Sequence, residues 1–246
     1  MPRIPAAREQ VRIQLLASDL WAISLYDVTW RTWINCYLLR RDAIIALIDS
    51  GKPEQSGALS DALASLGVRP GEVTDLVLTH GHLDHVGGAS MMSNATCHLH
   101  ALDLPLIADR GLVCPSLRSP VERAGTVNLG NTSLEYLVTG HHTPGSWVLW
   151  DPGAGALFSG DFICWFNERL PADGSVKAGL PELEARLLRF AGWWTSSPRF
   201  GDPAAFRQAV TGLVQRWKPQ LLCSGHGPVL EGDVASFLLA ISCGGR

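Results

Sequence analysis

The chain has 246 residues, of which 46% are hydrophobic and 17% are charged, and its formal net charge is −3 at pH 7. This composition is typical of a globular protein and excludes a largely disordered chain, and the small negative charge gives no general attraction to nucleic acid or to an anionic membrane surface. Because no apolar run approaches the roughly 20 residues that span a bilayer, we expect a small-molecule partner, no nucleic acid and no membrane.

The first residues and the cysteines indicate a compartment. Residues 1–10 lack the long apolar core of a secretory signal, so we expect a cytoplasmic protein. The six cysteines are scattered with no Cys-x-x-Cys pair, which argues against both a disulfide framework and a zinc ribbon. Free, buried thiols are therefore expected.

The first fifty residues predict a run of four strands. β-prone segments separated by short polar breaks place them at Val11–Leu16, Leu20–Leu25, Trp33–Leu39 and Ala43–Leu47. Asp49, Ser50 and Gly51 end this run. A carboxylate at a strand end can accept hydrogen bonds from a neighbouring loop, although an ordinary turn is the alternative interpretation. Apolar residues at helical spacing, followed by Gly67, then predict a helix over Pro53–Leu66.

The stretch from Thr79 to Gly88 follows a short buried strand predicted at Val73–Leu78. It places four side chains with ligand atoms within six positions, namely His80, His82, Asp84 and His85. Imidazole and carboxylate together suit Zn²⁺ and other first-row divalent ions. We expect a loop, because in extended chain His80 and His82 share one side while the other two turn toward a second point. A solvated polar loop without metal is the alternative, and it is disfavoured.

The segment after this cluster predicts short elements. We expect a helix at Ala89–Ser93, a strand at Thr96–His100, a helix at Leu102–Ile107 and a loop at Arg110–Arg123. His98 and His100 lie two apart on the expected strand. We interpret them as a structural or exposed pair rather than as metal ligands.

The second half of the chain predicts another run of strands followed by helices. The strands are expected at Thr126–Leu129, Thr132–Val138, Trp147–Trp150, Ala156–Ser159 and Leu221–Ser224. The helices are expected at Leu180–Gly192, Pro203–Trp217 and Val234–Ile241. No linker rich in proline, serine or charge marks a boundary, so residues 1–246 are predicted to form one domain.

Three further polar residues each lie beside glycine at a predicted strand end: His142, Asp161 and His226. Each alone is more often a turn residue than a ligand. Together with the first cluster, they supply one set from His80, His82 and His142 and a second set from Asp84, His85 and His226, with Asp161 able to bridge. Two-metal hydrolases hold their ions roughly 3.5–4 Å apart, and the sequence therefore predicts a dinuclear centre.

These motifs make the chain similar to the metallo-β-lactamase superfamily. The resemblance is carried by five segments in the family's order: Asp49-Ser50-Gly51, the run from His80 to His85, Gly140–Ser146, Phe158–Asp161 and Ser224–Pro228. It implies an α+β fold, a four-layer αββα sandwich of two similar halves with the metal site at one edge between the sheets. Since His141 is one position off the family pattern, the ligand is assigned to His142, and His141 is expected to be an exposed or supporting neighbour.

The ligand chemistry predicts hydrolysis. A water shared by two divalent ions, most simply Zn²⁺ with Fe or Mn as alternatives, has its pKa lowered from 15.7 to about 7 or less. The resulting bridging hydroxide would attack a carbonyl that the ions polarise. Asp84 is the candidate catalytic residue, because it could also orient the nucleophile or carry a proton to the leaving group.

Differences between this sequence and individual branches of the superfamily narrow the class of substrate that we expect. Lactamases of this family usually lack the aspartate found at position 161 and carry a leader, and the apolar run after Asp161 differs from that of glyoxalase II. Cys164 stands where lactonases commonly have tyrosine. We expect an ester, lactone or thioester with an apolar or aromatic acyl group.

Several alternatives stay open. They are a glyoxalase II-type thioesterase, a mono-iron oxygenase like the persulfide dioxygenases, a promiscuous β-lactamase and a non-catalytic binding protein. A homodimer is also left open. The aromatic residues Trp165, Phe166, Trp193 and Trp194 are expected either to line the pocket or to lie in the core or an interface.

Overall fold

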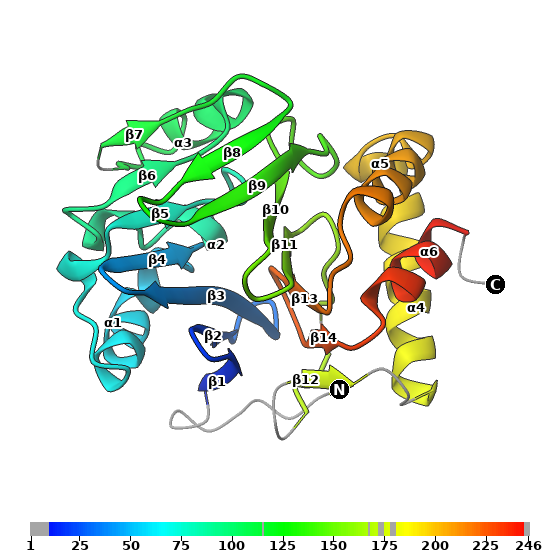
Figure 1. Ribbon diagram of the computed structural model, residues 1–246, viewed down its shortest axis with the longest axis horizontal. Coiled ribbons are helices and arrows are strands. Elements are labelled where there is room, and N and C mark those ends of the chain that lie inside the picture. Colours follow the sequence, from blue (N-terminus) through cyan, green and yellow to red (C-terminus); the bar gives the residue numbers. More distant parts are fainter. Residues whose placement is uncertain (1–9, 115, 167, 172–174, 178–180, 244–246) are drawn as a thin grey trace.

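The first half of the chain forms a seven-stranded sheet whose strands follow one another in chain order (Figure 1). The computed structural model describes residues 10–114, 116–166, 168–171, 175–177 and 181–243. The strands of this first sheet are β1 (Val11–Ala17), β2 (Leu20–Asp27), β3 (Thr32–Arg41), β4 (Ile44–Ile48), β5 (Asp75–Val77), β6 (Thr96–His98) and β7 (Leu117–Arg118). Neighbours are antiparallel from β1 to β4 and parallel from β4 to β7. The predicted strands are confirmed, whereas β7 lies in a stretch predicted to be a loop.

The second half forms another seven-stranded sheet in which the strand order departs from chain order. From one edge to the other its strands are β12 (Ser175–Lys177), β14 (Val229–Glu231), β13 (Leu221–Ser224), β11 (Ala156–Gly160), β10 (Trp147–Asp151), β9 (Ser133–Val138) and β8 (Ala124–Asn128). β13 runs parallel to β11, so the chain returns to the middle of the sheet after its helices. Neither β12 nor β14 was predicted, because each has only three residues and too little alternation, whereas the equally short β5 and β6 lie within longer segments predicted to be strands.

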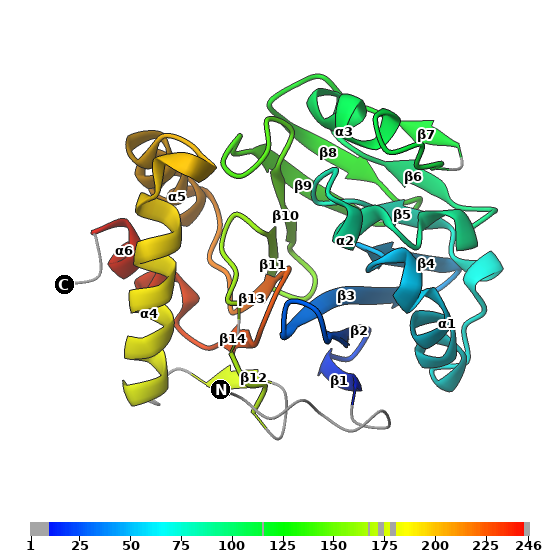
Figure 2. The same cartoon turned by 180° about the vertical axis from the view of Figure 1, so that it is seen from behind.

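Helices cover the outer face of each sheet (Figures 1 and 2). Beside the first sheet lie α1 (Ser56–Ser65), α2 (Leu83–Val86) and α3 (Leu104–Ala108), with the 3₁₀ turns η2 (Pro53–Gln55), η3 (Pro70–Glu72), η4 (Ala89–Met91) and η5 (Ala101–Asp103). Beside the second lie α4 (Pro181–Ser196), η6 (Pro198–Phe200), α5 (Pro203–Arg216) and α6 (Val234–Ser242). Among the described residues, the helices are all too short or too polar to cross a membrane.

Three apolar layers separate these elements and confirm the predicted four-layer αββα sandwich. One layer lies between the two sheets and includes Trp147 and Phe158, both almost fully buried. The other two lie between each sheet and its helices. Removing a large side chain such as Phe158 would cost about 3–5 kcal/mol.

Side-chain alternation on β5 shows how this packing positions the end of the strand. Val77 points into the layer between the sheets, whereas Leu76 and Leu78 point toward the helices. The chain then leaves β5 at the edge where β4 also ends, because the two strands are parallel. Polar residues that follow these strands therefore meet at one edge of the sandwich, which is where open α/β sheets bind ligands.

Candidate metal centre

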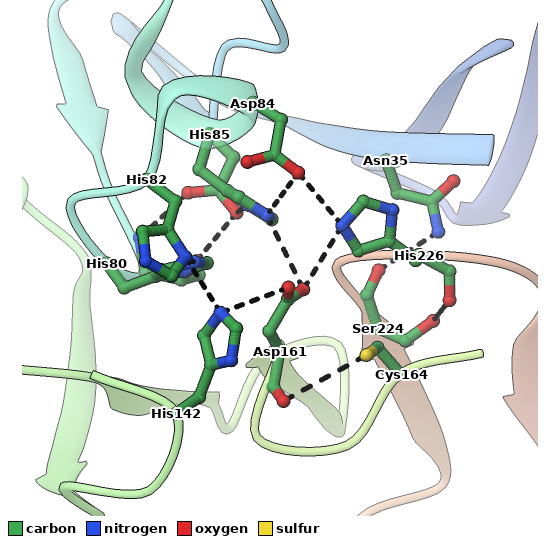
Figure 3. A network of polar contacts seen from close by, with 12 residues as sticks. Asn35, His80, His82, Asp84, His85, His142, Asp161, Cys164, Ser224 and His226 are labelled. Carbon is green, nitrogen blue, oxygen red and sulfur yellow. Dashed lines mark hydrogen bonds and ion pairs between the residues drawn. The ribbon is translucent and has the colours of Figure 1, made fainter. Parts of the chain in front are cut away.

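Loops that follow four strands, β5, β9, β11 and β13, bring the seven predicted ligands together at this edge (Figure 3). Three groups of their ligand atoms each lie within 4.8 Å of one another, and they are His80, His82 and His142; His80, His85 and Asp161; and Asp84, His85 and His226. The set predicted from the sequence is thus found in one place, and each residue lies in at least one group.

The first four ligands do not all lie in a loop, so that prediction was wrong in part. His82 has an extended backbone and forms the N-cap of α2. Its carbonyl oxygen accepts hydrogen bonds from the amides of His85 at 3.0 Å and Val86 at 3.1 Å, which closes one helical turn. The turn rotates Asp84 and His85 away from His82, and this is why four ligands in six positions can face two centres.

We call His80, His82 and His142 the imidazole cluster. Nδ1 of His82 lies 3.1 Å from Nε2 of His80 and 2.9 Å from Nε2 of His142. Burial lowers the pKa of His142 to about 4, and burial followed by the charges of His85 and His142 holds the pKa of His80 well below its usual value. All three rings are therefore neutral at pH 7, as ligation of a metal requires.

We call Asp84, His85 and His226 the carboxylate cluster. Nε2 of His226 lies 3.1 Å from Oδ2 of Asp84, and Nε2 of His85 lies 3.5 Å from the same oxygen. Burial alone would lower the pKa of His226, but Asp161 and Asp84 outweigh it and raise the pKa to about 9. Burial likewise opposes charge on His85, yet Asp84, Asp161 and Asp49 raise its pKa well above the usual value.

Asp161 lies between the two clusters (Figure 3). One carboxylate oxygen is 3.4 Å from Nε2 of both His85 and His226, and the other is 3.4 Å from Nε2 of His142. Burial would raise the pKa of Asp161, but the charges of His226 and His85 lower it well below the usual value. It is thus an ionised carboxylate that both clusters can share.

Two glycines make this close approach feasible. Gly160 ends β11 with φ of +49°, and a Cβ there would lie 2.6 Å from Oγ1 of Thr79. Gly225 precedes His226, and a Cβ there would lie 2.5 Å from Oδ1 of Asp161. Larger residues at either position would displace the ligand loops.

Asp49 supports the carboxylate cluster, as its place at a strand end suggested. Its carboxylate accepts hydrogen bonds from the amide of Thr79 at 2.7 Å, from the hydroxyl of Thr79 at 2.8 Å and from Nδ1 of His85 at 2.8 Å. A bond to Nδ1 leaves Nε2 as the ligand atom of His85. Asp49 itself has φ of +59°, a left-handed conformation that is uncommon outside glycine.

Asp103 supports the imidazole cluster, as Asp49 supports the carboxylate cluster. The sequence did not identify this role. Its carboxylate accepts hydrogen bonds from the amide of Gly81 at 2.8 Å, from the hydroxyl of Thr143 at 2.7 Å and from the amide of Gly145 at 2.7 Å. It therefore joins the loop of His80 and His82 to the loop of His142. An aspartate in a short helical stretch gives no signal of this role.

Asn35 was also missed, and it holds the loop of His226. Its side-chain amide donates to the carbonyl oxygens of Ser224 at 3.0 Å and Gly227 at 2.8 Å, and its backbone amide donates to Gly225 at 2.9 Å. Asn35 is fully buried in β3. A polar residue inside an apolar strand is the signal that could have found it.

His141 departs from its expected place. Its ring is 2% exposed and packs against Phe162 and Phe206, so the exposed alternative was wrong. Neither ring nitrogen has a hydrogen-bond partner among the described residues. Burial lowers the pKa of His141 to about 4, so the ring is neutral at pH 7.

His98 and His100 lie outside the three ligand groups. Nε2 of His98 is 2.8 Å from Oδ1 of Asp75, and Nε2 of His100 is 3.2 Å from the carbonyl oxygen of Glu122. Both rings are buried. They are structural, which agrees with the interpretation from the sequence.

A cavity of about 480 Å³ opens onto the centre, and its lining includes His82, Asp84, His142 and Asp161. Phe166 forms one wall, with its ring 4.3 Å from that of His226. The other three aromatic candidates are absent from the described lining.

Those three aromatic residues lie around the centre in different ways. Trp165 is fully buried in the core beside α6, and Trp193 is 62% exposed. Trp194 lies next to His142, with ring centroids 5.7 Å apart, and its indole nitrogen donates to the carbonyl oxygen of Asp161 at 3.0 Å. Of the four candidates, Phe166 alone lies in the described cavity wall, and the core alternative holds for Trp165.

Cys164 is buried beside Asp161. Burial, followed by the charges of Asp161 and Asp84, raises its pKa well above the usual value. The side chain therefore stays a neutral thiol, which is a poor nucleophile.

Several of the predicted ligand atoms have no hydrogen-bond partner among the described residues, and a metal ion would satisfy them. Nε2 of His85, Nε2 of His226 and Oδ1 of Asp161 are buried and make no hydrogen bond with the described residues. Such atoms each cost about 1–3 kcal/mol unless something else satisfies them. Because imidazole nitrogens and carboxylate oxygens are the preferred ligands of first-row divalent ions, the centre is suited to hold such ions.

A comparison with protein families gives a match over most of the first two thirds of the chain. A family model described as the metallo-beta-lactamase superfamily matches residues 33–181. That range includes six of the seven predicted ligands and the supporting residues Asp49 and Asp103.

Curated relatives agree with this match. The uncharacterised protein YobT of Bacillus subtilis is 26% identical over 86% of this chain and 90% of its own length. The hydroxyacylglutathione hydrolase of Anaeromyxobacter dehalogenans is 35% identical over 52% of this chain, and the match covers 46% of that enzyme.

Solved structures share the fold. A metallo-beta-lactamase from Pontibacter korlensis is 20% identical with a TM-score of 0.69, covering 95% of this chain and 99% of that one. The rubredoxin oxygen:oxidoreductase of Desulfovibrio gigas is 20% identical with a TM-score of 0.73, but this chain spans only 60% of its length.

Proposed function

Because this chain belongs to the metallo-β-lactamase superfamily, we propose that it is a hydrolase that depends on two divalent metal ions and cleaves an ester, lactone or thioester. The position of Asp161 carries the proposal. Its two oxygens approach ligands of different clusters at 3.4 Å, which is the arrangement expected of a carboxylate shared by two ions.

The seven ligands would hold these ions, for which Zn²⁺ is our first choice and Fe or Mn the alternatives. When bound, such ions lower the pKa of a shared water to about 7 and polarise a carbonyl. The chain supplies the rest. Asp49 and Asp103 fix the ligand loops through their hydrogen bonds.

Asp84 is proposed as the residue that handles protons. It lines the cavity, and its Oδ2 lies 3.1 Å from Nε2 of His226. Burial would raise the pKa of Asp84, but the neighbouring His85 and His226 lower it well below the usual value. It is thus ionised at pH 7 and can orient a water molecule or accept its proton.

The substrate is proposed to be a small molecule with an apolar or aromatic part. Phe166, Leu83 and Trp30 line the cavity together with the ligands, and such side chains suit an apolar group. A thioesterase of the glyoxalase II type is the second candidate, because a hydroxyacylglutathione hydrolase is 35% identical over half of this chain.

Elemental analysis and a substrate screen test the proposal. Protein purified without a metal-binding tag should contain about two equivalents of metal, and it should hydrolyse at least one member of a panel of aryl esters, lactones and thioesters that includes S-lactoylglutathione. Because Asp84 is also a predicted ligand, Asp84→Asn should bind metal more weakly at the carboxylate cluster, and even when loaded with excess metal to two equivalents it should lose most of kcat. Full activity in that variant would exclude its proton role, and one iron with oxygen consumption would replace the proposal by an oxygenase.

A further inference from the structure

We propose that the cavity above the metal centre contains a subsite for a substrate carboxylate, formed around Arg110 on the side of the imidazole cluster. The preferred substrate would then carry its scissile carbonyl at the centre and a carboxylate at some distance from it. This inference rests on the proposed function, because its kinetic test requires hydrolysis. Its second test measures ligand binding and requires no hydrolysis.

Arg110 is held beside the ligand loop by a hydrogen bond. Its Nη1 donates to the carbonyl oxygen of Gly81 at 3.2 Å, and Gly81 lies between His80 and His82. The amide of Gly81 is itself bound by the buried Asp103 at 2.8 Å. This hydrogen bond therefore positions the guanidinium of Arg110 next to two predicted ligands.

Most of the donor capacity of Arg110 remains for a ligand. A guanidinium has five N–H donors in a planar fork. Among the described residues, Gly81 is the one hydrogen-bond partner of Arg110, and no carboxylate there forms an ion pair with it. Arginine binds carboxylates through two parallel hydrogen bonds, which adds both strength and directional selectivity.

A second cation lies on the same side of the cavity. Arg199 belongs to η6 and lines the cavity together with Arg110. Two residues later, a Cβ at Gly201 would lie 2.6 Å from Nδ1 of His141, the neighbour of the ligand His142. Arginines from two distant segments thus border the imidazole cluster.

A third cation in the cavity lining is already paired. Lys52 also lines the cavity, but its ammonium group forms an ion pair with Asp27 and lies 3.7 Å from the centroid of the Trp30 ring. Glu54 lies beside it in the lining and carries a negative charge. A substrate carboxylate is therefore favoured at Arg110 rather than at Lys52.

A structural role for Arg110 is the competing explanation, and the two differ in what they affect. If the hydrogen bond to Gly81 only positions the loop, then removing it weakens metal binding and slows every substrate alike. If Arg110 binds a carboxylate, then its removal affects charged substrates and leaves metal content and neutral substrates unchanged. The charge of the substrate therefore separates the two explanations.

The kinetic test compares two 4-nitrophenyl esters that differ by one charge. One is the monoester of glutaric acid with a free carboxylate, and the other is its methyl-capped analogue. We expect kcat/KM to be at least about tenfold higher for the charged ester, as one charge-assisted hydrogen bond predicts. In Arg110→Gln this preference should disappear through KM, while the neutral ester and metal content stay within about twofold.

A matched control removes a similar cation elsewhere. Arg69 is the exposed N-cap of η3, pairs with Glu72 and is not part of the described cavity lining. Arg69→Gln should keep the preference for the charged ester. Loss of the preference in both variants would overturn the subsite, because a general field rather than a local contact would then explain it.

Binding of two acids gives a readout that needs no turnover. Glutarate and butyrate each have one carboxylate that can reach the metal ions, but only glutarate has a second one. By calorimetry on the metal-loaded protein, glutarate should bind about tenfold more tightly than butyrate, and Arg110→Gln should remove the difference. Equal binding in the unaltered protein, or loss of metal from the variant, would overturn the proposal.

The two proposals fail in different ways. If no ester, lactone or thioester is hydrolysed by the metal-loaded protein, the proposed function fails, and the glutarate and butyrate comparison still decides the subsite. If esters are hydrolysed without regard to charge, the subsite fails and the hydrolase proposal stands.

Discussion

The imidazole cluster and the carboxylate cluster lie side by side but differ in charge. Burial keeps the rings of the first neutral and lowers the pKa of His142 to about 4. In the second, neighbouring carboxylates overcome the same burial and raise the pKa of His226 to about 9. The same residue type, mostly or fully buried in both clusters, thus takes opposite protonation states according to the charges around it.

This difference indicates what occupies each cluster when metal is absent. The imidazole cluster can accept a cation without releasing protons. The carboxylate cluster holds protons on His85 and His226 that balance Asp84 and Asp161, and a metal ion must displace them. Protons therefore compete with metal at one cluster and hardly at the other.

Removing Asp161 should have the largest effect, because this carboxylate contacts both clusters. In Asp161→Ala we expect the metal content to fall to about one equivalent, retained by the three rings of the imidazole cluster. kcat/KM should drop by more than roughly 100-fold, beyond the loss that orienting residues typically cause. Elemental analysis and steady-state kinetics measure this, with circular dichroism as the control for folding. Two retained equivalents would show that the clusters bind independently of the bridge.

Changing the pH should separate the two clusters next. Binding at the carboxylate cluster displaces protons from both His226 and His85, so affinity for the second equivalent of Zn²⁺ should rise steeply from pH 7 to pH 9, by about tenfold per pH unit for each proton displaced. Affinity for the first equivalent should change much less, because His142 is already neutral above about pH 4. Competition titrations with a chelator at several pH values measure both. Equal slopes would contradict the assignment of protons.

Replacing the supporting carboxylates should then weaken one cluster at a time. Asp49→Asn removes the charge behind His85, and Asp103→Asn removes the charge that joins Gly81 to Thr143. Each should lower the affinity of its own cluster for metal by roughly 10–100-fold. Titration of both variants with Zn²⁺ decides this. If both variants weaken the affinity of the same Zn²⁺ binding step, Asp49 and Asp103 do not each support a different cluster.

The smallest effect should come from His141, the neutral ring next to the imidazole cluster. Its folded pKa of about 4 lies below the unfolded value of about 6.5, so the unfolded chain alone takes up a proton as pH falls from 7 to 5. Stability should fall by about 2 kcal/mol over that range from this residue.

The His141→Phe variant should lose this share of the acid sensitivity, because phenylalanine has nothing to protonate and suits the neighbouring Phe162 and Phe206. Urea denaturation of both metal-free proteins at pH 7, 6 and 5 measures the difference. A constant difference across pH would rule out His141 as the cause.

The sequence identified the residues that the structure brings together, because each has a local signal. Asp161 and His226 stand beside glycine after strands, and His142 follows Gly140 by two residues, so the end of each strand can be recognised from nearby residues. The longer strands were recognised for the same reason. By contrast, α2 is a single turn, and whether four residues turn or stay extended depends on tertiary contacts.

The supporting residues could not be predicted in the same way. Asp103 and Asn35 act through hydrogen bonds to segments that lie far away in the sequence, such as Gly145 and Gly227. Which loop meets which aspartate is decided when the sheets pack, and no local pattern records it. Asp49 was the exception, since its place at the end of β4 already faced the loop that follows β5.

The return of the chain to β13 affects how the centre is assembled during synthesis. All three residues of the imidazole cluster precede residue 143, whereas His226 follows α5 and is locked in place by Asn35 of β3. On the proposed dinuclear centre, a nascent chain that has not yet emerged beyond α5 carries one complete predicted ligand set and one incomplete set. Since proteins begin to fold from the N-terminus as they are made, we propose that the first cation is captured before the last strands of the sheet emerge and the second only afterwards.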